Sequence, residues 1–396
     1  MEKVADNAAR RSARSIATDP RFRSFLVQFV LLLGVAWLGW TFYRNAQSNL
    51  AAQNIASGFG FLEQTAGFGI SQTLIPYAES SSYGRAFLVG LANTVLVAVL
   101  GIIFATLIGF TVGIARLSSN VLVARLAGAY VEVMRNLPLL FQILFWYLAV
   151  LGALPGPRQS EPLFGAIYLS NRGLLLPRIL FEPGSGTVVA AFFVGIAGAI
   201  FLHFWGRRRQ EATGHRPHTG LWSLALIIGL TAVAAIATGV PFGIELPELR
   251  GFNFVGGVRV IPELLALLFA LSTYTGAFIS EVVRAGILAV PKGQTEAARS
   301  VGLTRGQTLR LIVAPQSMRL IVPPLTNQYL NLTKNSSLAA AIGYPDFFYV
   351  FAGTTLNQTG QAIEIIAVTM AVYLAISLIT AALMNWYNRA LALRGG

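Results

Sequence analysis

The chain has 396 residues, of which 55% are hydrophobic and only 11% are charged. Soluble domains contain about 25% charged residues, so this chain has too few charges to cover a soluble protein of its length. The mean hydropathy is +0.64, and several uncharged runs reach the roughly 20 residues that cross a bilayer core. Together these values exclude an ordinary soluble protein and predict a polytopic membrane protein.

The net charge of +13 is the second compositional feature. Its distribution decides between a nucleic-acid ligand and a membrane topology, because Lys and Arg gather on the cytoplasmic side of membrane spans. The chain contains no Cys, which excludes disulfides, thiolate metal ligands and thiol nucleophiles. Its three histidines, His203, His215 and His218, are too few and too scattered to predict a metal site.

Eight apolar stretches are predicted to be membrane-spanning helices. The first follows a basic tail over 1–23 and is longer than the roughly 7 to 15 residues of a signal-peptide core, so it is predicted to be a retained anchor. The connections 44–85 and 155–185 are long and are predicted to be ordered caps or loops. The predicted spans are 24–43, 86–115, 126–154, 186–205, 220–240, 262–283, 320–343 and 362–387.

The basic residues are unevenly distributed between the two sides of these spans. With the N-terminus inside, 20 of the 29 Lys and Arg fall in inner segments and 7 in outer segments, while Arg135 and Lys334 lie within spans. This bias predicts that both termini are cytoplasmic. Membrane topology therefore accounts for the positive charge, and no nucleic-acid ligand is predicted.

The cytoplasmic loop over 284–319 has the local chemistry of two short helices joined by a turn. Thr295 is predicted to cap the first helix, with Glu296 in the first turn, where the helix dipole favours an anion. Gly302 suits the left-handed position that ends a helix. The loop is therefore predicted to be ordered.

The second helix of the loop is predicted to start at a capping box and to end at a proline. Thr304 and Gln307 have the capping-box spacing, and apolar residues follow at helical intervals until Pro315. Two short helices held between membrane spans suit contact with a partner, although an amphipathic loop resting on lipid headgroups is an alternative. A DNA-binding domain is disfavoured, because the loop has no room for a third helix.

The order Glu296-Ala297-Ala298, Gly302 and Pro315 resembles the EAA motif of permease subunits of ATP-binding cassette (ABC) importers. In that family the motif forms the coupling helices, which insert into a cleft of the cytoplasmic ATPase. Ala314 stands where the family usually has Leu, outside the coupling turn. The ATPase-docking residues that the resemblance implies are Gly293, Gln294, Glu296, Ala297, Ala298, Gly302 and Thr304.

Further segments resemble amino-acid importers of the histidine-permease type. Asn136 and Leu137 replace the Gly and Thr that usually follow the arginine of this family, so no substrate preference is carried over from short relatives. The extra N-terminal helix and the insertion resemble the Q-type permease subunits of general L-amino-acid importers. The matching segments are 90–94, 130–142, 281–286, 291–294 and 332–338.

This resemblance implies an all-α, type I importer permease domain over 86–389. Its core has five helices, to which the helix at 24–43 and a two-helix insertion at 155–261 are added, making about eight spans. The implied function is translocation of L-amino acids, with broad specificity, across the bacterial inner membrane. The implied partners are a cytoplasmic ATPase dimer, a second and different permease subunit, and a periplasmic amino-acid-binding protein.

The chain is not predicted to be an enzyme or to bind a cofactor. It has no Gly-x-x-x-x-Gly-Lys-Ser/Thr phosphate loop, so ATP and Mg are expected to be used by the partner ATPase. The alternative function is an ion- or proton-coupled secondary amino-acid transporter, a class in which intramembrane acids couple transport. An intramembrane hydrolase is disfavoured, because His203, the only histidine in a span, has no Gly-x-Ser-x-Gly nucleophile to serve.

Ionisable residues inside spans mark a bundle interior or a water-filled path. Glu132 and Arg135 are three residues apart and share a helix face, either as an ion pair or as part of the path. Lys334 lies in a polar span that Pro323 and Pro324 are predicted to interrupt, so it is expected to face a cavity, with a structural packing role as the alternative. The predicted substrate-path residues are Glu132, Arg135, Lys334, Asn335, Ser336 and Ser337.

Overall fold

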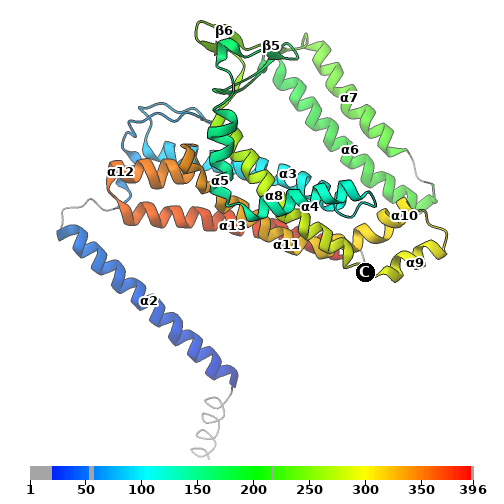
Figure 1. The fold of residues 1–396 in the computed structure, drawn as a ribbon, viewed down its shortest axis with the longest axis horizontal. Coiled ribbons are helices and arrows are strands. Elements are labelled where there is room, and N and C mark those ends of the chain that lie inside the picture. The colour runs from blue at the N-terminus through cyan, green and yellow to red at the C-terminus, as the bar shows by residue number, and fades with distance from the viewer. Residues whose placement is uncertain (1–19, 53–57, 216–217, 394–396) are drawn as a thin grey trace, which may run out of the picture. The chain divides into compact units, whose positions relative to one another are not determined.

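The computed structural model describes residues 20–52, 58–215 and 218–393. Helices predominate, as predicted (Figure 1). The chain divides into two compact units, one of Met1–Val95 with Pro345–Leu383 and the other of Leu96–Tyr344 with Met384–Gly396. The predicted basic tail lies outside the described residues up to position 19.

The first unit contains the N-terminal helix and an aromatic core. The N-terminal helix is longer at both ends than the predicted span 24–43. In the core, the Phe87 ring meets the rings of Phe347 and Phe351 edge-on, with centroids 4.9 and 5.3 Å apart. The elements of this unit are α2 (Pro20–Ala52), η1 (Gly60–Glu63), η6 (Phe348–Thr355) and α12 (Leu356–Thr359), while α3 (Tyr83–Ala115) and α13 (Ala362–Leu393) extend into both units.

A short segment before η6, residues 345–347, is held by buried polar groups of the same unit. The Asn93 side-chain amide donates to the carbonyl oxygen of Pro345 at 2.8 Å, and the backbone N–H of Phe347 donates to the Thr94 hydroxyl at 2.9 Å. Asp346 is fully buried and accepts the Tyr349 N–H at 2.8 Å. Burial raises the pKa of Asp346 to about 7.

The second unit is built around the long helix α8 (Pro262–Leu288), half of whose residues are buried. Its other helical elements are α4 (Val121–Asn136), α5 (Leu139–Leu144), η2 (Phe145–Leu151), α6 (Ser185–Thr213), α7 (Thr219–Ala237), α9 (Lys292–Ser300), α10 (Arg305–Thr308), η4 (Leu309–Val313), α11 (Ala314–Asn335) and η5 (Ser336–Ile342). The helices α4, α5, η2, α11 and η5 contact α8 directly, α9, α10 and η4 follow it along the chain, and α6 and α7 pack against each other.

Glycines allow α3 and α11 to approach α8 closely. A β-carbon added to Gly113 of α3 would lie 2.8 Å from the Ser280 carbonyl oxygen and 2.9 Å from Val283 of α8. On a neighbouring face of α8, Gly286 lies directly against Ile321 of α11. Small residues at such crossings let helices gain van der Waals contact in lipid, where no hydrophobic force drives them together.

The predicted third span, 126–154, is not one straight helix. Its two halves, Val121–Asn136 and Leu139–Leu151, meet at an angle of 106°. Pro138 lies at the break, where its fixed φ and missing N–H interrupt the helix. The Gln142 amide closes the bend by donating to the carbonyl oxygens of Met134 and Leu137 at 2.9 and 3.1 Å.

The 155–261 insertion contains the two predicted helices, α6 and α7, and also strands that the sequence did not predict. Gly195 of α6 allows close packing, since an added β-carbon would lie 2.9 Å from the Ile227 Cα of α7. The helices form an antiparallel hairpin (Figure 1). The remaining residues form small antiparallel sheets joined by turns and by η3 (Pro157–Gln159).

The largest sheet has four strands in the order β1-β2-β3-β8 and contacts α8 through β3. Two ribbons, β4-β5 and β6-β7, complete the insertion. The strands are β1 (Pro162–Leu163), β2 (Ile167–Ser170), β3 (Gly173–Leu176), β4 (Arg178–Phe181), β5 (Phe242–Glu245), β6 (Glu248–Arg250), β7 (Asn253–Val255) and β8 (Val258–Val260).

The number of membrane spans is six or seven by length and composition among the described residues. The seventh is the bent pair of α4 with α5 and η2. The predicted count of about eight is therefore not confirmed, because the predicted span 320–343 corresponds to the polar helix α11 and the short η5. The helix α11 also runs through Pro323 and Pro324 without the predicted interruption, and both prolines lie on its exposed side.

The contact of α3 with α8 predicts that a single methyl group at Gly113 destabilises the protein. We expect Gly113→Ala to lower the free energy of unfolding by about 1–3 kcal/mol, because the added methyl overlaps backbone of α8. Gly128→Ala in α4 is the matched control, since no atom lies within 4 Å of its added methyl. Thermal unfolding in detergent measures both variants, and equal midpoints would contradict this packing.

The burial of Asp346 predicts a pH-dependent stability. Its pKa in the folded protein, about 7, is higher than its ordinary value of 3.8, so the folded state binds the proton more tightly than the unfolded chain. Stability from this group is therefore greatest at low pH and is lost as pH rises towards 7. We expect the thermal midpoint of Asp346→Asn, relative to the unmodified protein, to be higher at about pH 8 than at about pH 5. A pH-independent difference would contradict the assignment.

Candidate functional site

The loop between α8 and α11 contains the two predicted helices, α9 and α10, and the turn between them. Gly302 has a φ of +82°, the left-handed conformation that the sequence predicted for this position. The Leu303 N–H donates to the Ala298 carbonyl oxygen at 3.1 Å and closes the end of α9. An L-residue with a side chain is strained at this φ, so glycine fixes the sharp reversal of the chain.

The predicted capping box of the second helix is confirmed. The Gln307 N–H donates to the Thr304 hydroxyl at 3.3 Å, and the Thr304 N–H donates to the Gln307 side-chain oxygen at 2.9 Å. These two bonds satisfy backbone donors that have no partner inside the helix. The turn and the start of α10 therefore form one ordered unit.

The predicted start of the first helix was wrong. The helix α9 begins at Lys292, after Pro291, so Thr295 lies inside it and Glu296 is beyond its first turn. Pro291 precedes the helix with extended backbone, and its carbonyl oxygen accepts the Gln294 N–H at 3.0 Å. Proline at a helix start needs no N–H, which explains why the helix begins there without a side-chain cap.

The predicted end of the second helix was also wrong. The helical path continues from α10 through η4 into α11, with Pro315 in the first turn of α11. The π-helical turns of η4 change the hydrogen-bond pattern just before the proline. Pro315 is therefore accommodated, and the loop is joined to α11 as one continuous helical segment.

The helix α9 presents small and polar side chains to its surroundings. Gly293, Gln294, Glu296 and Ala297 are exposed, and an added β-carbon on Gly293 would meet no atom within 4 Å. Ala298 is only 5% exposed and anchors the helix on the opposite side. These four predicted docking residues are thus exposed to a partner, whereas Ala298 packs against the rest of the protein.

The loop is tied to the start of α11 by a hydrogen bond between side-chain amides. The Gln316 amide donates to the Gln294 side-chain oxygen at 3.2 Å. The helix α9 is therefore linked to α11 through this contact as well as through α10 and η4.

The predicted substrate-path residues of α11 and η5 separate onto different sides. Lys334 is exposed, whereas Ser336 is fully buried and donates its hydroxyl to the Thr333 carbonyl oxygen at 2.8 Å. Ser337 is partly buried and donates to the Lys334 carbonyl oxygen at 2.8 Å. Lys334 is thus available to a ligand, while the Ser336 hydroxyl already has a partner.

Two further exposed polar residues accompany Lys334 on α11, and neither is among the substrate-path residues predicted from the sequence. Asn327 and Asn331 lie seven and three residues before Lys334, which places the three side chains on one helix face. The recurring polar residues at helical spacing were the signal that identifies this face. A membrane-embedded helix does not expose such a face to hydrocarbon, so it faces water or protein.

The structure does not join the two ionisable residues predicted to share a face of α4. Glu132 and Arg135 are both exposed, and the Arg135 guanidinium lies over the Phe278 ring, 5.1 Å from its centroid. A cation over an aromatic face is stabilised without an anion. The predicted alternative of an ion pair is therefore not formed.

An ion triad that the sequence analysis did not predict joins α3 and α8 near their last turns. The two oxygens of Glu281 bind different arginines, Arg116, which directly follows α3, and Arg284 of α8, the latter at 2.7 Å. A carboxylate bridging two guanidinium groups satisfies its lone pairs in a partly buried place. The triad fixes the end of α3 beside the start of the α8–α11 loop.

Comparisons with known proteins cover most of the chain. Residues 101–393 match the family described as binding-protein-dependent transport system inner membrane component. The chain is 49% identical over 382 residues to the general L-amino acid transport system permease protein AapQ of Rhizobium johnstonii, covering 96% of this chain and 95% of that protein. It is 51% identical over 376 residues to the putative amino-acid ABC transporter permease protein YhdX of Escherichia coli, covering 95% of each.

A third relative is named for a narrower range of substrates. The chain is 42% identical over 411 aligned positions to the glutamate/glutamine/aspartate/asparagine transport system permease protein BztB of Rhodobacter capsulatus, covering 95% of each. None of these relatives supports the alternative of an ion-coupled secondary transporter. The chain therefore belongs to the binding-protein-dependent transport system inner membrane components, the multi-span, non-catalytic permease subunits of ABC importers.

Proposed function

We propose that this permease translocates L-amino acids of several side-chain classes inward across the bacterial inner membrane, with both termini in the cytoplasm. The names of the three relatives that match nearly the whole chain support the substrate class. The excess of Lys and Arg in alternate connections supports the orientation. The single observation that carries the coupling role is the exposed helix α9, held between α8 and α11.

In this proposal, α9 and the turn at Gly302 insert into a cytoplasmic ATPase that binds ATP and Mg. The exposed Gly293 and Ala297 permit close approach, and Glu296 offers a charge at the contact. Closure of the ATPase dimer moves α9, and the Gln294–Gln316 bond and the continuous helix into α11 pass this movement to the membrane. The other partners are a second, different permease subunit and a periplasmic amino-acid-binding protein.

The substrate path in this proposal runs along the polar face of α11 that includes Asn327, Asn331 and Lys334. An ammonium group suits the carboxylate that all L-amino acids share, and side-chain amides can both donate and accept hydrogen bonds. Such a face recognises the common backbone of the substrates rather than one side chain. It therefore fits a permease of broad specificity.

The docking proposal predicts that a bulky residue on the exposed face of α9 releases the ATPase. We expect Ala297→Trp to reduce at least tenfold the ATPase recovered with the tagged chain from its native host, because the indole prevents close approach. Ala212→Trp is the matched control, since Ala212 is also an exposed helical alanine near a helix end. Equal ATPase recovery with both variants, measured by mass spectrometry, would refute docking at α9.

The path proposal predicts that removing the ammonium group at Lys334 impairs transport without releasing the ATPase. We expect Lys334→Met to lower amino-acid uptake about tenfold, a loss of about 1.4 kcal/mol of interaction. Ser336→Ala is the control, because this hydroxyl is buried and already bonded to Thr333. Uptake by reconstituted vesicles measures both, and a normal rate for Lys334→Met would exclude Lys334 from the path.

A further inference from the structure

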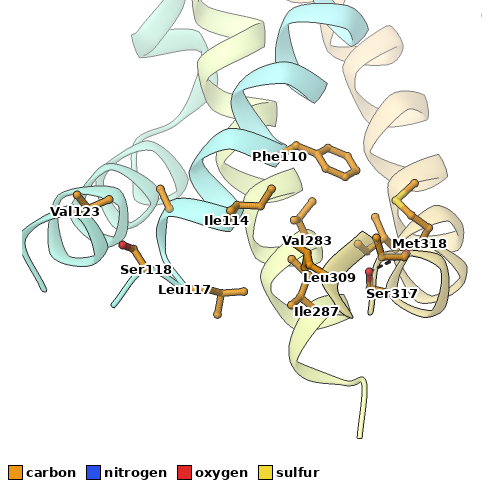
Figure 2. A pocket seen from close by; sticks show the side chains of 13 residues that line it. Phe110, Ile114, Leu117, Ser118, Val123, Val283, Ile287, Leu309, Ser317 and Met318 are labelled. Carbon is orange, nitrogen blue, oxygen red and sulfur yellow. Dashed lines mark hydrogen bonds between the residues drawn. The ribbon is translucent and has the colours of Figure 1, made fainter. Parts of the chain in front are cut away.

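A cavity of about 550 Å³ lies in the second unit, where α3 and α8 end and α11 begins (Figure 2). It lies near the loop that joins α8 to α11, residues 289–313, which we call the coupling loop. Phe110 and Ile114 of α3 form one wall, and Val283 and Ile287 of α8 form another. Met318 of α11 faces them. This volume lies in the range of pockets that hold a small ligand or part of one.

The shape of the cavity follows from the glycine-mediated helix contacts. Deeper in the bundle, α3 and α11 touch directly, since the hydroxyls of Thr106 and Tyr329 are 2.8 Å apart. Towards the coupling loop, Gly113 holds α3 against α8 and Gly286 holds α11 against α8. Both helices are therefore held against α8 near its end, and the space between α3 and α11 is left open there.

The interior of the cavity offers nothing to a polar ligand. Its only side-chain hydroxyls are those of Ser118 and Ser317. The Ser317 hydroxyl donates to the Ala314 carbonyl oxygen at 3.1 Å, and the Ser118 hydroxyl accepts the Asn120 N–H at 3.1 Å. A zwitterionic amino acid is thereby excluded, because its charges would be buried without partners. Hydrocarbon is the ligand chemistry that fits.

The segments around the cavity are strongly basic. Residues 109–125, 279–290 and 305–322 contain six arginines and a single acid, Glu281, which already binds two of them. Arg310 and Arg319 are exposed, and no acid among the described residues forms an ion pair with either. The six arginines are Arg116, Arg125, Arg284, Arg305, Arg310 and Arg319.

The depth of the cavity also matches a lipid. Ala115, the last residue of α3, and Ile287, one residue before the end of α8, both line it. The ends of membrane spans lie at the level where acyl chains meet their headgroups. The hydrocarbon chain of an anionic lipid therefore suits the apolar cavity, and its headgroup suits the basic residues around it.

We propose that the cavity holds one acyl chain of an anionic phospholipid, whose phosphate is attracted by Arg310 and Arg319. The chain occupies space between α3 and the segment from Leu309 to Ser317, which links the coupling loop to α11. It therefore supports the coupling loop from the membrane side. This last consequence rests on the proposed function, whereas the lipid site itself does not.

The test compares two tryptophan substitutions on α3. Ile114→Trp fills the cavity, and Leu107→Trp is the matched control, because the two side chains are 55% and 60% exposed and Leu107 does not line the cavity. The full chain, with any subunits that accompany it, is extracted in mild detergent from membranes containing phosphatidylglycerol. Phosphatidylglycerol retained per chain is then measured by mass spectrometry.

We expect Ile114→Trp to retain at least tenfold less phosphatidylglycerol than the unmodified protein, and Leu107→Trp to retain the same amount. Equal retention by all three proteins, or none by the unmodified protein, would overturn the proposal. Loss of a protein subunit with unchanged lipid would also overturn it, since a protein segment would then be the occupant.

A charge variant tests the headgroup and does not depend on a tryptophan being tolerated. Arg310→Gln with Arg319→Gln alters two exposed side chains. In nanodiscs of equal phosphatidylglycerol and phosphatidylcholine, we expect this variant to lose the preference for phosphatidylglycerol among retained lipids. An unchanged preference would refute the assigned headgroup contact. These readouts need no ATPase, so they separate failure of the lipid site from failure of the docking proposal.

Discussion

Close contact of α3 and α11 with α8 is the interaction on which the second unit depends. Lipid tails are as apolar as Leu side chains, so helices associate in a membrane through tight packing and not through exclusion of water. Gly113 and Gly286 supply that contact by leaving out side chains. The Glu281 triad then adds a polar link near the end of α3. The coupling loop, the polar face of α11 and the acyl-chain cavity all take their positions from these contacts.

The same packing explains how a loop without catalytic groups can take part in energy transfer. A helix that ended at Pro315 would leave α9 on a flexible tether, and its movement would be lost in the loop. The continuous path from α10 to α11, with the capping box at one end and the Gln294–Gln316 bond beside it, makes the segment stiff. In the proposed function, this connection makes the exposed face of α9 and the membrane helix move together.

Two features of the α8–α11 loop that depend on local chemistry were predictable from the sequence, whereas the ends of its helices and the features that depend on packing were not. Gly302 and the capping box at Thr304 follow from backbone sterics and nearby hydrogen bonds, and both were predicted correctly. The bend at Pro138 was missed, although the proline and the polar residues Glu132, Arg135 and Asn136 before it were signals of a break. The strands of the insertion have two to four residues, too few to show an alternating pattern. Lys334 and Ser336 are two positions apart, so helix geometry places them on different faces, but which of the two is buried depends on packing.

The pairing of β3 with β8 has a consequence for how the chain came to be longer than a five-helix core. These strands lie near the two ends of the insertion, and their register sets Leu174 opposite Val260 and Leu176 opposite Val258. The insertion therefore leaves and rejoins the core at neighbouring points. A segment with adjacent ends can be acquired or lost without moving the helices on either side of it. The hairpin and its strands are in this sense an accessory that evolution can exchange while the transport core stays unchanged.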